Sequence, residues 1–419
     1  PNGLTVLTLV DESTPVVSFQ VWVRAGSGDE SKYTGIAHLF EHMMFRGSKN
    51  LPPEAHSKLI EARGGRVNAF TSRDVTVYFA DISPEHLPLV IELEAERLRN
   101  LDISEESLAS ERQVVLEERR LRTEDNPQGR AFEALLALAF QAHPYRHPTI
   151  GWRADVEAVT VAASQAFFER YYAANNLIVA VAGNFDEAET LRQIREQFGP
   201  LPKREPPVRN PTIEPEQNGE RRAIVHFPVR SPVFAVAWQA PATGHPDSAA
   251  LDVASTILSG GRTSRLYRRL VYGDALALSA SGYYWELARG GVFYGFAGVR
   301  PGVSIEDVEA AFFEEVAKLA GGGVSEAELE KAKRKLEVSL LGDLATSHAQ
   351  ASRLGGDTIA FGRVRPLSER LASIRAVSAA DVVRVAATYL PREKRSVVHV
   401  LPPPPEDTAM WGVERGGRP

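Results

Sequence analysis

The sequence predicts an α+β protein made of two homologous domains that are joined by a linker. Three observations lead to this prediction. The chain has 419 residues, which is too long for one typical hydrophobic core and suits two domains. Two widely separated patterns of strand and helix recur at a nearly constant offset, and a segment rich in proline and polar residues lies between the two copies.

The internal repeat consists of two pairs of matching segments. A strand pattern that begins at Pro15 recurs from Pro232, 217 residues later. A helix followed by a strand begins at Val159 and recurs from Val377, 218 residues later. Chance can produce either match alone, but two matches at almost one offset indicate a duplication.

The repeat divides the chain into a first domain over residues 1–200, a linker over 201–220, a second domain over 221–405 and a tail over 406–419. The linker is proline-rich and polar and has little to bury. The run Leu401-Pro402-Pro403-Pro404-Pro405 cannot continue a sheet. We therefore expect the tail to be a loose arm or an arm that contacts a partner.

The composition excludes several classes of protein. A net charge of -6 and an isoelectric point near 6.0 leave no basic surface for nucleic acid. No apolar run reaches the length of a membrane span, so we expect no membrane segment. The chain has no cysteine, which excludes disulfides and thiolate ligands. Any metal ion must therefore be held by histidine and carboxylate side chains.

The most informative motif is His38-Leu39-Phe40-Glu41-His42, which has apolar flanks. In a helix, His38 and His42 lie on one face about one turn apart, the spacing at which two imidazoles reach one zinc ion. Glu41 lies on nearly the same side, where it can take a proton from zinc-bound water without binding the metal itself. This is the H-x-x-E-H order of the inverzincins. The alternative is a helix that happens to carry two structural histidines.

A catalytic zinc site usually takes three protein ligands, so a third must come from another segment. Residues 104–123 read as a helix with Ser104 as its N-cap and Asn126-Pro127 as its end. Four residues of this helix have the spacing of a face that points into the core, namely Glu111, Val114, Val115 and Glu118.

An inward-facing carboxylate needs a cation, and zinc supplies one. We therefore predict that Glu118 is the third ligand. Glu111, two turns earlier, is predicted to support a ligand or to face the substrate, with an ordinary helix salt bridge as the alternative. Glu117 is expected to face water or a neighbouring arginine.

These motifs resemble those of the M16 (pitrilysin-like) zinc peptidases, and in particular the short bacterial members that are similar to the mitochondrial processing peptidase β subunit. The second motif of that family appears here as Glu111-Arg112-Gln113-Val114-Val115-Leu116-Glu117-Glu118, and Glu118 follows His42 by 76 residues. The resemblance implies that His38, His42 and Glu118 bind one Zn²⁺ per chain. It also implies that Glu41 is the general base and that Glu111 assists catalysis.

The segment from Gly64 to Phe79 reads as a Gly-Gly turn, a strand, a polar turn and a second strand. In the M16 family the first of these strands is a sheet edge beside the zinc, and substrate pairs with its backbone. The resemblance thus implies that Asn68, Ala69 and Phe70 bind extended peptide substrates. The alternative is a plain hairpin in which Asn68 only caps a turn.

The resemblance also implies an architecture. Each domain is expected to carry an antiparallel-rich sheet with helices packed on one face, and the chain is expected to enclose a chamber together with a second two-domain chain. The second copy has no imidazole in the corresponding helix, Ser248 to Leu258, so only the first domain is expected to be the catalytic zinc domain.

The second domain departs from the family pattern at two positions. Many M16 members carry an Arg and a Tyr there, which contact the peptide and stabilise the oxyanion, whereas this chain has Val271 and Leu278. We therefore expect a heterodimer with a homologous M16 subunit that lacks the zinc motif and carries the Arg-Tyr pair. The alternative is a homodimer that uses Arg268 or Tyr272.

The predicted function is a zinc-dependent endopeptidase that cleaves unfolded or extended peptides. One alternative is a non-catalytic scaffold subunit of the same fold, like the core proteins of the bc1 complex, and another is a different zinc hydrolase. The chain begins with Pro1, so we expect that it was trimmed or processed. Similar bacterial proteins are often exported, so we expect a periplasmic location, with the cytoplasm as the alternative.

A weaker metal-like signal is His143-Pro144-Tyr145-Arg146-His147, where the proline breaks a helix and favours a loop without metal. The remaining histidines have no partner at ligand spacing and are expected to be structural, namely His56, His86, His226, His245, His348 and His399.

Overall fold

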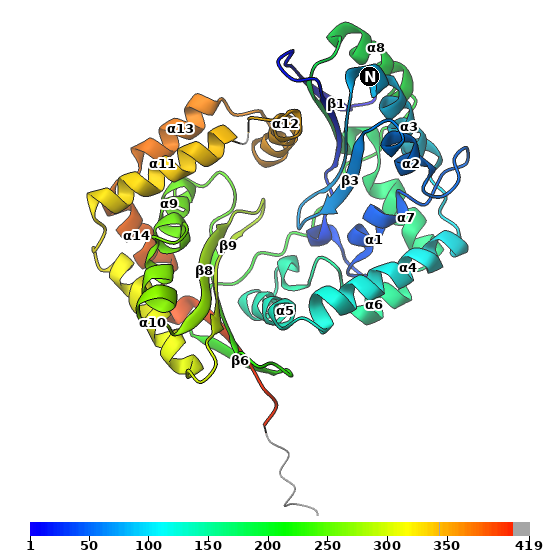
Figure 1. Cartoon of the computed structure of the whole chain (residues 1–419). Coiled ribbons are helices and arrows are strands. Elements are labelled where there is room, and N and C mark those ends of the chain that lie inside the picture. Colours follow the sequence, from blue (N-terminus) through cyan, green and yellow to red (C-terminus); the bar gives the residue numbers. More distant parts are fainter. Residues whose placement is uncertain (343, 405–419) are drawn as a thin grey trace, which may run out of the picture.

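The protein folds into two similar halves, each built on a five-stranded sheet (Figure 1). The structure is a computed structural model that describes residues 1–342 and 344–404. The predicted tail, residues 406–419, lies outside the described residues. Residues 201–220, the predicted linker, form no helix or strand. Among the described residues, no helix combines the length and the hydrophobicity that a membrane-spanning helix needs.

The first sheet has one parallel pair, between its outermost strand and the next, and three antiparallel pairs. Two of its three inner strands are buried at every residue, because both faces of the sheet are covered. The order across the sheet is β1 (Thr5–Val10), β5 (Leu177–Gly183), β2 (Val17–Val23), β4 (Thr76–Ile82) and β3 (Arg66–Thr71).

The second sheet repeats this arrangement strand by strand. Its outermost strand again pairs in parallel, and the other pairs are antiparallel. The equivalent order confirms the predicted duplication and the α+β class. The order is β6 (Arg221–His226), β10 (Arg395–Leu401), β7 (Val233–Ala240), β9 (Gly291–Val299) and β8 (Ala277–Trp285).

One face of the first sheet is covered by helices of the first half, as predicted, and the main core lies between them. Alternate side chains of β2, including Phe19 and Val21, point into this core. The helices of the first half are α1 (Ile36–Met43), α2 (Ala55–Glu61), α3 (Leu87–Asn100), α4 (Glu105–Arg119), α5 (Pro127–Ala139), α6 (Arg153–Ala158), α7 (Val161–Tyr171) and α8 (Glu187–Phe198).

The second sheet is covered in the same way, with Phe234 and Trp238 of β7 in the core. The helices of the second half are α9 (Ser248–Ser259), α10 (Ile305–Ala320), α11 (Glu326–Gly342), α12 (Ser347–Phe361), α13 (Leu367–Ala376) and α14 (Ala379–Tyr389). Helix α9 packs on β8, as α1 packs on β3 in the first half.

The opposite face of each sheet receives a helix from the other half. Helix α5 packs on β6, β7 and β10, and helix α12 packs on β1, β2 and β5. Figure 1 shows both helices on the inner side, between the two sheets. Helices on one face only were predicted, so this exchange adds a layer that the repeat pattern does not reveal.

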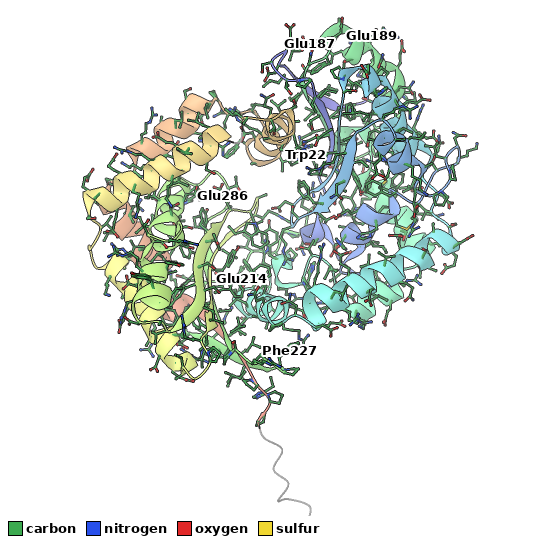
Figure 2. The ribbon with its side chains drawn as sticks, viewed as in Figure 1. Trp22, Glu187, Glu189, Glu214, Phe227 and Glu286 are labelled. Atoms are coloured by element: carbon green, nitrogen blue, oxygen red, sulfur yellow. The ribbon has the colours of Figure 1, made fainter. Side chains whose placement is uncertain are left out.

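The contact of α12 with the first sheet depends on a glycine. The indole ring of Trp22 points toward α12 (Figure 2) and lies where a side chain at Gly355 would be, because a Cβ atom there would be 2.3 Å from Cε2 of Trp22. Ala351 and Leu354 complete the small apolar core around Trp22. The two halves are therefore locked together by close packing on both sides.

Candidate metal centre

Helix α1 carries the H-x-x-E-H motif, and its apolar face is fixed in the first core. Leu39, Phe40 and Met43 are fully buried. The chain enters the helix through Gly35 at φ 88, and a Cβ there would be 2.5 Å from a backbone oxygen, so only glycine fits. Buried Glu30 accepts hydrogen bonds from the backbone N–H groups of Gly35 and Ala37, both at 2.9 Å. This carboxylate satisfies N–H groups that the first turn leaves free.

Helix α4 begins where the sequence predicts, because the Ser104 side chain accepts a hydrogen bond from the backbone of Ser107. Glu111 and Val115 are buried, as predicted. The prediction for Val114 is wrong, since its side chain is 42% exposed. Val114 lies about 60° round the helix from Glu111, at the margin of the stripe that faces α1. Glu117 is exposed and pairs with Arg120, as expected.

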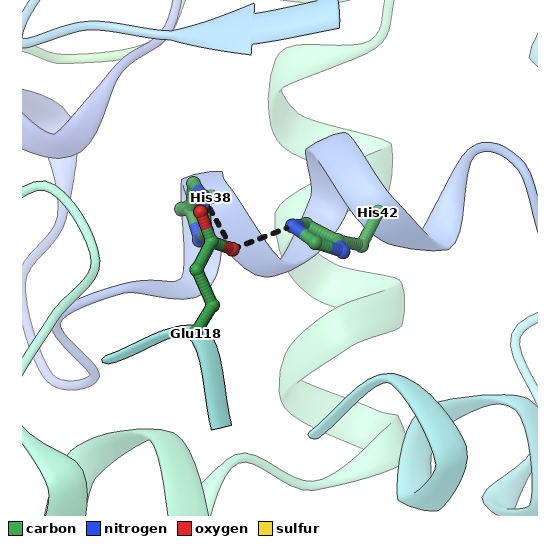
Figure 3. A group of neighbouring side chains, drawn as sticks. All are labelled: His38, His42 and Glu118. Carbon is green, nitrogen blue, oxygen red and sulfur yellow. Dashed lines mark ion pairs between the residues drawn. The ribbon is translucent and has the colours of Figure 1, made fainter. Parts of the chain in front are cut away.

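The structure brings the three predicted ligands together (Figure 3). Oε2 of Glu118 lies 3.2 Å from Nε2 of His42 and 3.6 Å from Nε2 of His38. The candidate ligand atoms of the three residues all lie within 4.8 Å of one another. This is the one group of at least three potential metal-binding side chains within residues 1–342 and 344–404. Two imidazole nitrogens and one carboxylate oxygen form a donor set that suits zinc and leaves a fourth position for water.

The electrostatics of the cluster also fit a cation. Burial lowers the pKa of His38 to about 4, so its imidazole is neutral at pH 7. Burial opposes protonation of His42 as well, but hydrogen bonds to Glu111 and Glu118 raise its pKa to about 9. The two carboxylates therefore favour a proton on His42 when no metal is bound. A metal ion would replace this proton, as expected for ligands that bind in deprotonated form.

Glu111 lies behind His42. Its Oε2 is 3.1 Å from Nδ1 of His42, and its Oε1 accepts a hydrogen bond from Nε of Arg46. The residue is only 3% exposed. A carboxylate that holds the far nitrogen of a ligating histidine fixes the orientation of the ring. Of the three arrangements considered for Glu111, this position agrees best with a carboxylate that supports His42, and its ion pair with Arg46 joins two different elements rather than two turns of one helix.

Glu41 lies beside the cluster and faces an open cavity. Burial raises the pKa of its carboxyl group, and a hydrogen bond with the side chain of Thr71 opposes the increase. A carboxylate with a raised pKa that is not itself a ligand suits a proton acceptor. Glu41 belongs to the same helix as His38 and His42, so its position is set by the same core packing.

The cavity has a volume of about 590 Å³ and is lined by residues of the first half together with Trp285 of the second half. One wall carries the cluster and strand β3, and the other is aromatic. Phe132 of α5 and Trp285 of β8 form this second wall and pack against each other with ring centroids 6.0 Å apart. The lining also includes Asn68, Ala69, Phe70, Thr71, Arg73, Arg122, Glu133, Leu136 and Ile150.

Strand β3 is the edge of its sheet, as expected, and its backbone is open on the side away from β4. Ser72 N–H donates to the carbonyl of Val75, so the alternation of an antiparallel pair turns the N–H and C=O groups of Ala69 outward. The Ala69 N–H donates to Oδ1 of Asn68 at 2.9 Å. The Asn68 side chain thus occupies the Ala69 N–H, which is a donor that a peptide added as a further strand could use.

The other histidines, which were not predicted to bind metal, lie outside the cluster. His143 and His147 flank a short 3₁₀ turn, Pro144–Arg146, and both are buried. His56 pairs with Glu94, His348 with Asp81 and His399 with Glu309. These pairs fit the structural roles that were predicted for them.

Sequence reasoning missed several residues of the site. Arg46 could have been found, because it follows His42 by four positions as His42 follows His38. Phe132 and Trp285 carry no such signal, since their approach to the cluster depends on the exchange of α5 between the halves.

The H-x-x-E-H order of the residues on α1 is that of the inverzincin class of metallopeptidases. Comparisons with known proteins agree. Residues 5–152 match the family model described as Insulinase (Peptidase family M16), and residues 158–336 match the one described as Peptidase M16 inactive domain. All three cluster residues lie in the first match.

Relatives match over nearly the whole chain. Zinc protease PqqE of Helicobacter pylori is 32% identical over 406 residues, which cover 96% of this chain and 91% of that protein. A probable mitochondrial-processing peptidase subunit beta of Arabidopsis thaliana is 30% identical over 403 residues, covering 93% of this chain and 75% of that protein. The crystal structure of a protease from Helicobacter pylori has a TM-score of 0.92 and 31% identity, covering 96% of this chain and 98% of that one. The chain therefore belongs to peptidase family M16.

Proposed function

We propose that this chain is a zinc-dependent endopeptidase that cleaves unfolded or extended peptides. The observation that carries the proposal is the convergence of His38, His42 and Glu118 beside Glu41 in a cavity bordered by an open strand edge. Relatives that align over almost the whole chain are named zinc proteases, which supports the same conclusion.

His38, His42 and Glu118 would hold the zinc ion. When bound, the ion supplies Lewis acidity toward water and toward the peptide carbonyl. Glu41 is close to the cluster but outside it, so it accepts the proton of the attacking water and delivers it to the leaving amine. The raised pKa of Glu41 suits both proton transfers, because the group must accept and then release a proton.

Substrate recognition follows from strand β3. An extended peptide that enters the cavity can pair with the outward N–H and C=O groups of Ala69, displacing the Asn68 side chain from that N–H. Backbone pairing tolerates many side chains and excludes peptides that are already folded. Asn68, Ala69 and Phe70 are thus assigned to substrate binding within this proposal.

A partner subunit completes the proposal. Leu278 is 55% exposed on β8, and neither it nor Val271 can donate a hydrogen bond. Losing one oxyanion donor typically costs about 10²–10³ in rate. We expect a homologous M16 subunit to supply an Arg and a Tyr in a shared chamber, with a homodimer that uses Arg268 or Tyr272 as the alternative. A periplasmic location belongs to the same proposal, with the cytoplasm as its alternative.

The matched inactive-domain model keeps one rival open, a non-catalytic scaffold of the same fold. A digest of a peptide library, combined with metal analysis, separates the two. The endopeptidase should contain one zinc per chain and cleave unstructured peptides, and removal of zinc with a chelator should stop cleavage until zinc is restored. A chain that binds no zinc and cleaves nothing, alone or with a homologous subunit, would be a scaffold.

A further inference from the structure

Arg46 is the nearest charged neighbour of the carboxylate that supports His42. It follows α1 by three residues, and its Nε–H donates to Oε1 of Glu111. The second oxygen of the same carboxylate faces Nδ1 of His42 at 3.1 Å. One buried carboxylate therefore bridges a guanidinium group and an imidazole group, and each of its two oxygens has one partner.

The pairing matters because Glu111 has little access to water. Its side chain is 4% exposed, while that of Arg46 is 24% exposed. A buried carboxylate without a cation loses its charge or moves toward solvent. The other acidic neighbour of Arg46 is Glu54. Its Oε1 lies 3.9 Å from Nη1 of Arg46, and its side chain is 56% exposed. Arg46 is thus held between a buried carboxylate and an exposed one.

We propose that Arg46 is a positioning residue, which fixes the Glu111 carboxylate so that His42 presents Nε2 to the metal. The inference rests on the proposed function, since it assigns His42 as a zinc ligand. Glu111 can hold Nδ1–H of His42 only while its own position is fixed, and the guanidinium group of Arg46 fixes it by a directional hydrogen bond. His38 has no equivalent support, because its Nδ1 is buried without a hydrogen-bond partner in the structure.

The zinc dissociation constant measures this effect directly. Loss of a group that orients a ligand typically weakens metal binding by about 10–100-fold. We expect Arg46→Gln to weaken zinc binding by about tenfold in a competition assay with a chromophoric chelator. Arg46→Lys should recover part of the loss, because an ammonium group restores the charge without the planar geometry.

Lys58→Gln is the matched control. Lys58 pairs with Glu54 at 2.8 Å, so this variant removes a cation from the same acidic neighbour without touching Glu111. Its zinc dissociation constant should equal that of the unaltered chain. Thermal unfolding of each variant without zinc shows whether a change in affinity reflects a damaged fold.

A double-mutant cycle tests whether Arg46 acts through Glu111. In a Glu111→Gln background, Arg46→Gln should cause no further loss of zinc affinity. Fully additive losses would show that Arg46 acts by another route and would overturn the inference. An unchanged dissociation constant in Arg46→Gln would also overturn it, even if the enzyme were active.

The outcomes for the two proposals differ. If the chain binds zinc but cleaves no peptide, the endopeptidase proposal is refuted. The effect of Arg46 on zinc affinity can still be measured in that case. Peptide cleavage with no effect of Arg46→Gln on zinc affinity would overturn the role of Arg46 alone. Absence of zinc binding by the unaltered chain would overturn both.

Discussion

Nε2 of His42 lies 3.2 Å from Oε2 of Glu118, although 76 positions separate the two residues in the sequence. The contact joins α1 to α4, and each helix is fixed by a buried apolar face. The packing of the two helices therefore holds these candidate ligand atoms close together, and such preorganisation would lower the entropic cost of binding a metal ion.

Removal of a ligand should release the metal. We expect His38→Ala and Glu118→Gln to reduce the zinc content from about one per chain to a small fraction, because a site with two protein ligands binds zinc weakly. Glu117→Gln is the matched control, since Glu117 is adjacent in sequence but exposed and paired with Arg120. Metal analysis after dialysis measures the content, and unchanged zinc in both ligand variants would refute the assignment.

Replacement of the proton acceptor should separate binding from catalysis. Glu41→Gln should keep its zinc, because Glu41 is outside the ligand group, while kcat falls by about 10²–10⁴-fold. Steady-state hydrolysis of an unstructured peptide and metal analysis of the same sample provide both values. Wild-type turnover in this variant would place the base at another residue.

A proline at position 69 should block strand addition. The Ala69 N–H points away from β4, so Ala69→Pro removes the donor without breaking the sheet. We expect kcat/KM to fall about tenfold or more, from the lost hydrogen bond and from the bulk of the ring. Ala69→Gly keeps the N–H and serves as the control. Equal kcat/KM values for the proline and glycine variants would show that substrate binds elsewhere.

The isolated chain should be a slow enzyme. If the oxyanion lacks a donor because Val271 and Leu278 replace Arg and Tyr, addition of a homologous subunit that carries the pair should raise kcat by about 10²–10³-fold. Peptide hydrolysis by the chain alone and by the mixture tests this, with a heat-denatured partner as control. Full activity of the isolated chain, unaffected by the partner, would contradict the shared chamber.

Stability should fall in mild acid. Burial lowers the pKa of His147 to about 4, with a further contribution from Arg73. The unfolded chain therefore binds this proton more tightly than the folded chain, and the folded state loses stability as the pH falls from about 6.5 to about 4.

His147 contributes at most about 1.4 kcal/mol per pH unit to the slope of the free energy of unfolding against pH. His147→Gln should reduce the slope of the free energy of unfolding over that pH range, as measured by urea denaturation. His86→Gln is the control, because His86 lies on the surface with its side chain 33% exposed. The same slope in the His147 variant and the parent would contradict the prediction.

Local patterns in the sequence predict the parts of the site that single elements build. The four-residue spacing of His38 and His42, the Ser104 cap and the inward positions of Glu111 and Glu118 all depend on helix geometry, which the sequence specifies directly. Val114 shows the limit of this reasoning. The width of the buried stripe depends on how closely α1 approaches, and spacing alone does not report it.

The features that sequence patterns did not predict depend on contacts between distant elements. The amphipathic pattern of α5 shows that one face is buried but does not identify the sheet that buries it. The aromatic wall of Phe132 and Trp285 and the bridge from Arg46 to Glu111 arise only when elements meet in three dimensions.

The reciprocal placement of α5 and α12 has a consequence for the history of the chain. In each half, the inner face of the sheet is covered by a helix that belongs to the other half. Each half also carries one helix that packs on the sheet of the other half. An ancestor with only one copy could bury the inner face of its sheet and the apolar face of this helix only by exchanging the helix with a second molecule, as a domain-swapped dimer. Fusion of two such genes would convert a concentration-dependent assembly into an intramolecular one. One copy could then lose its histidines while continuing to provide the wall of the cavity.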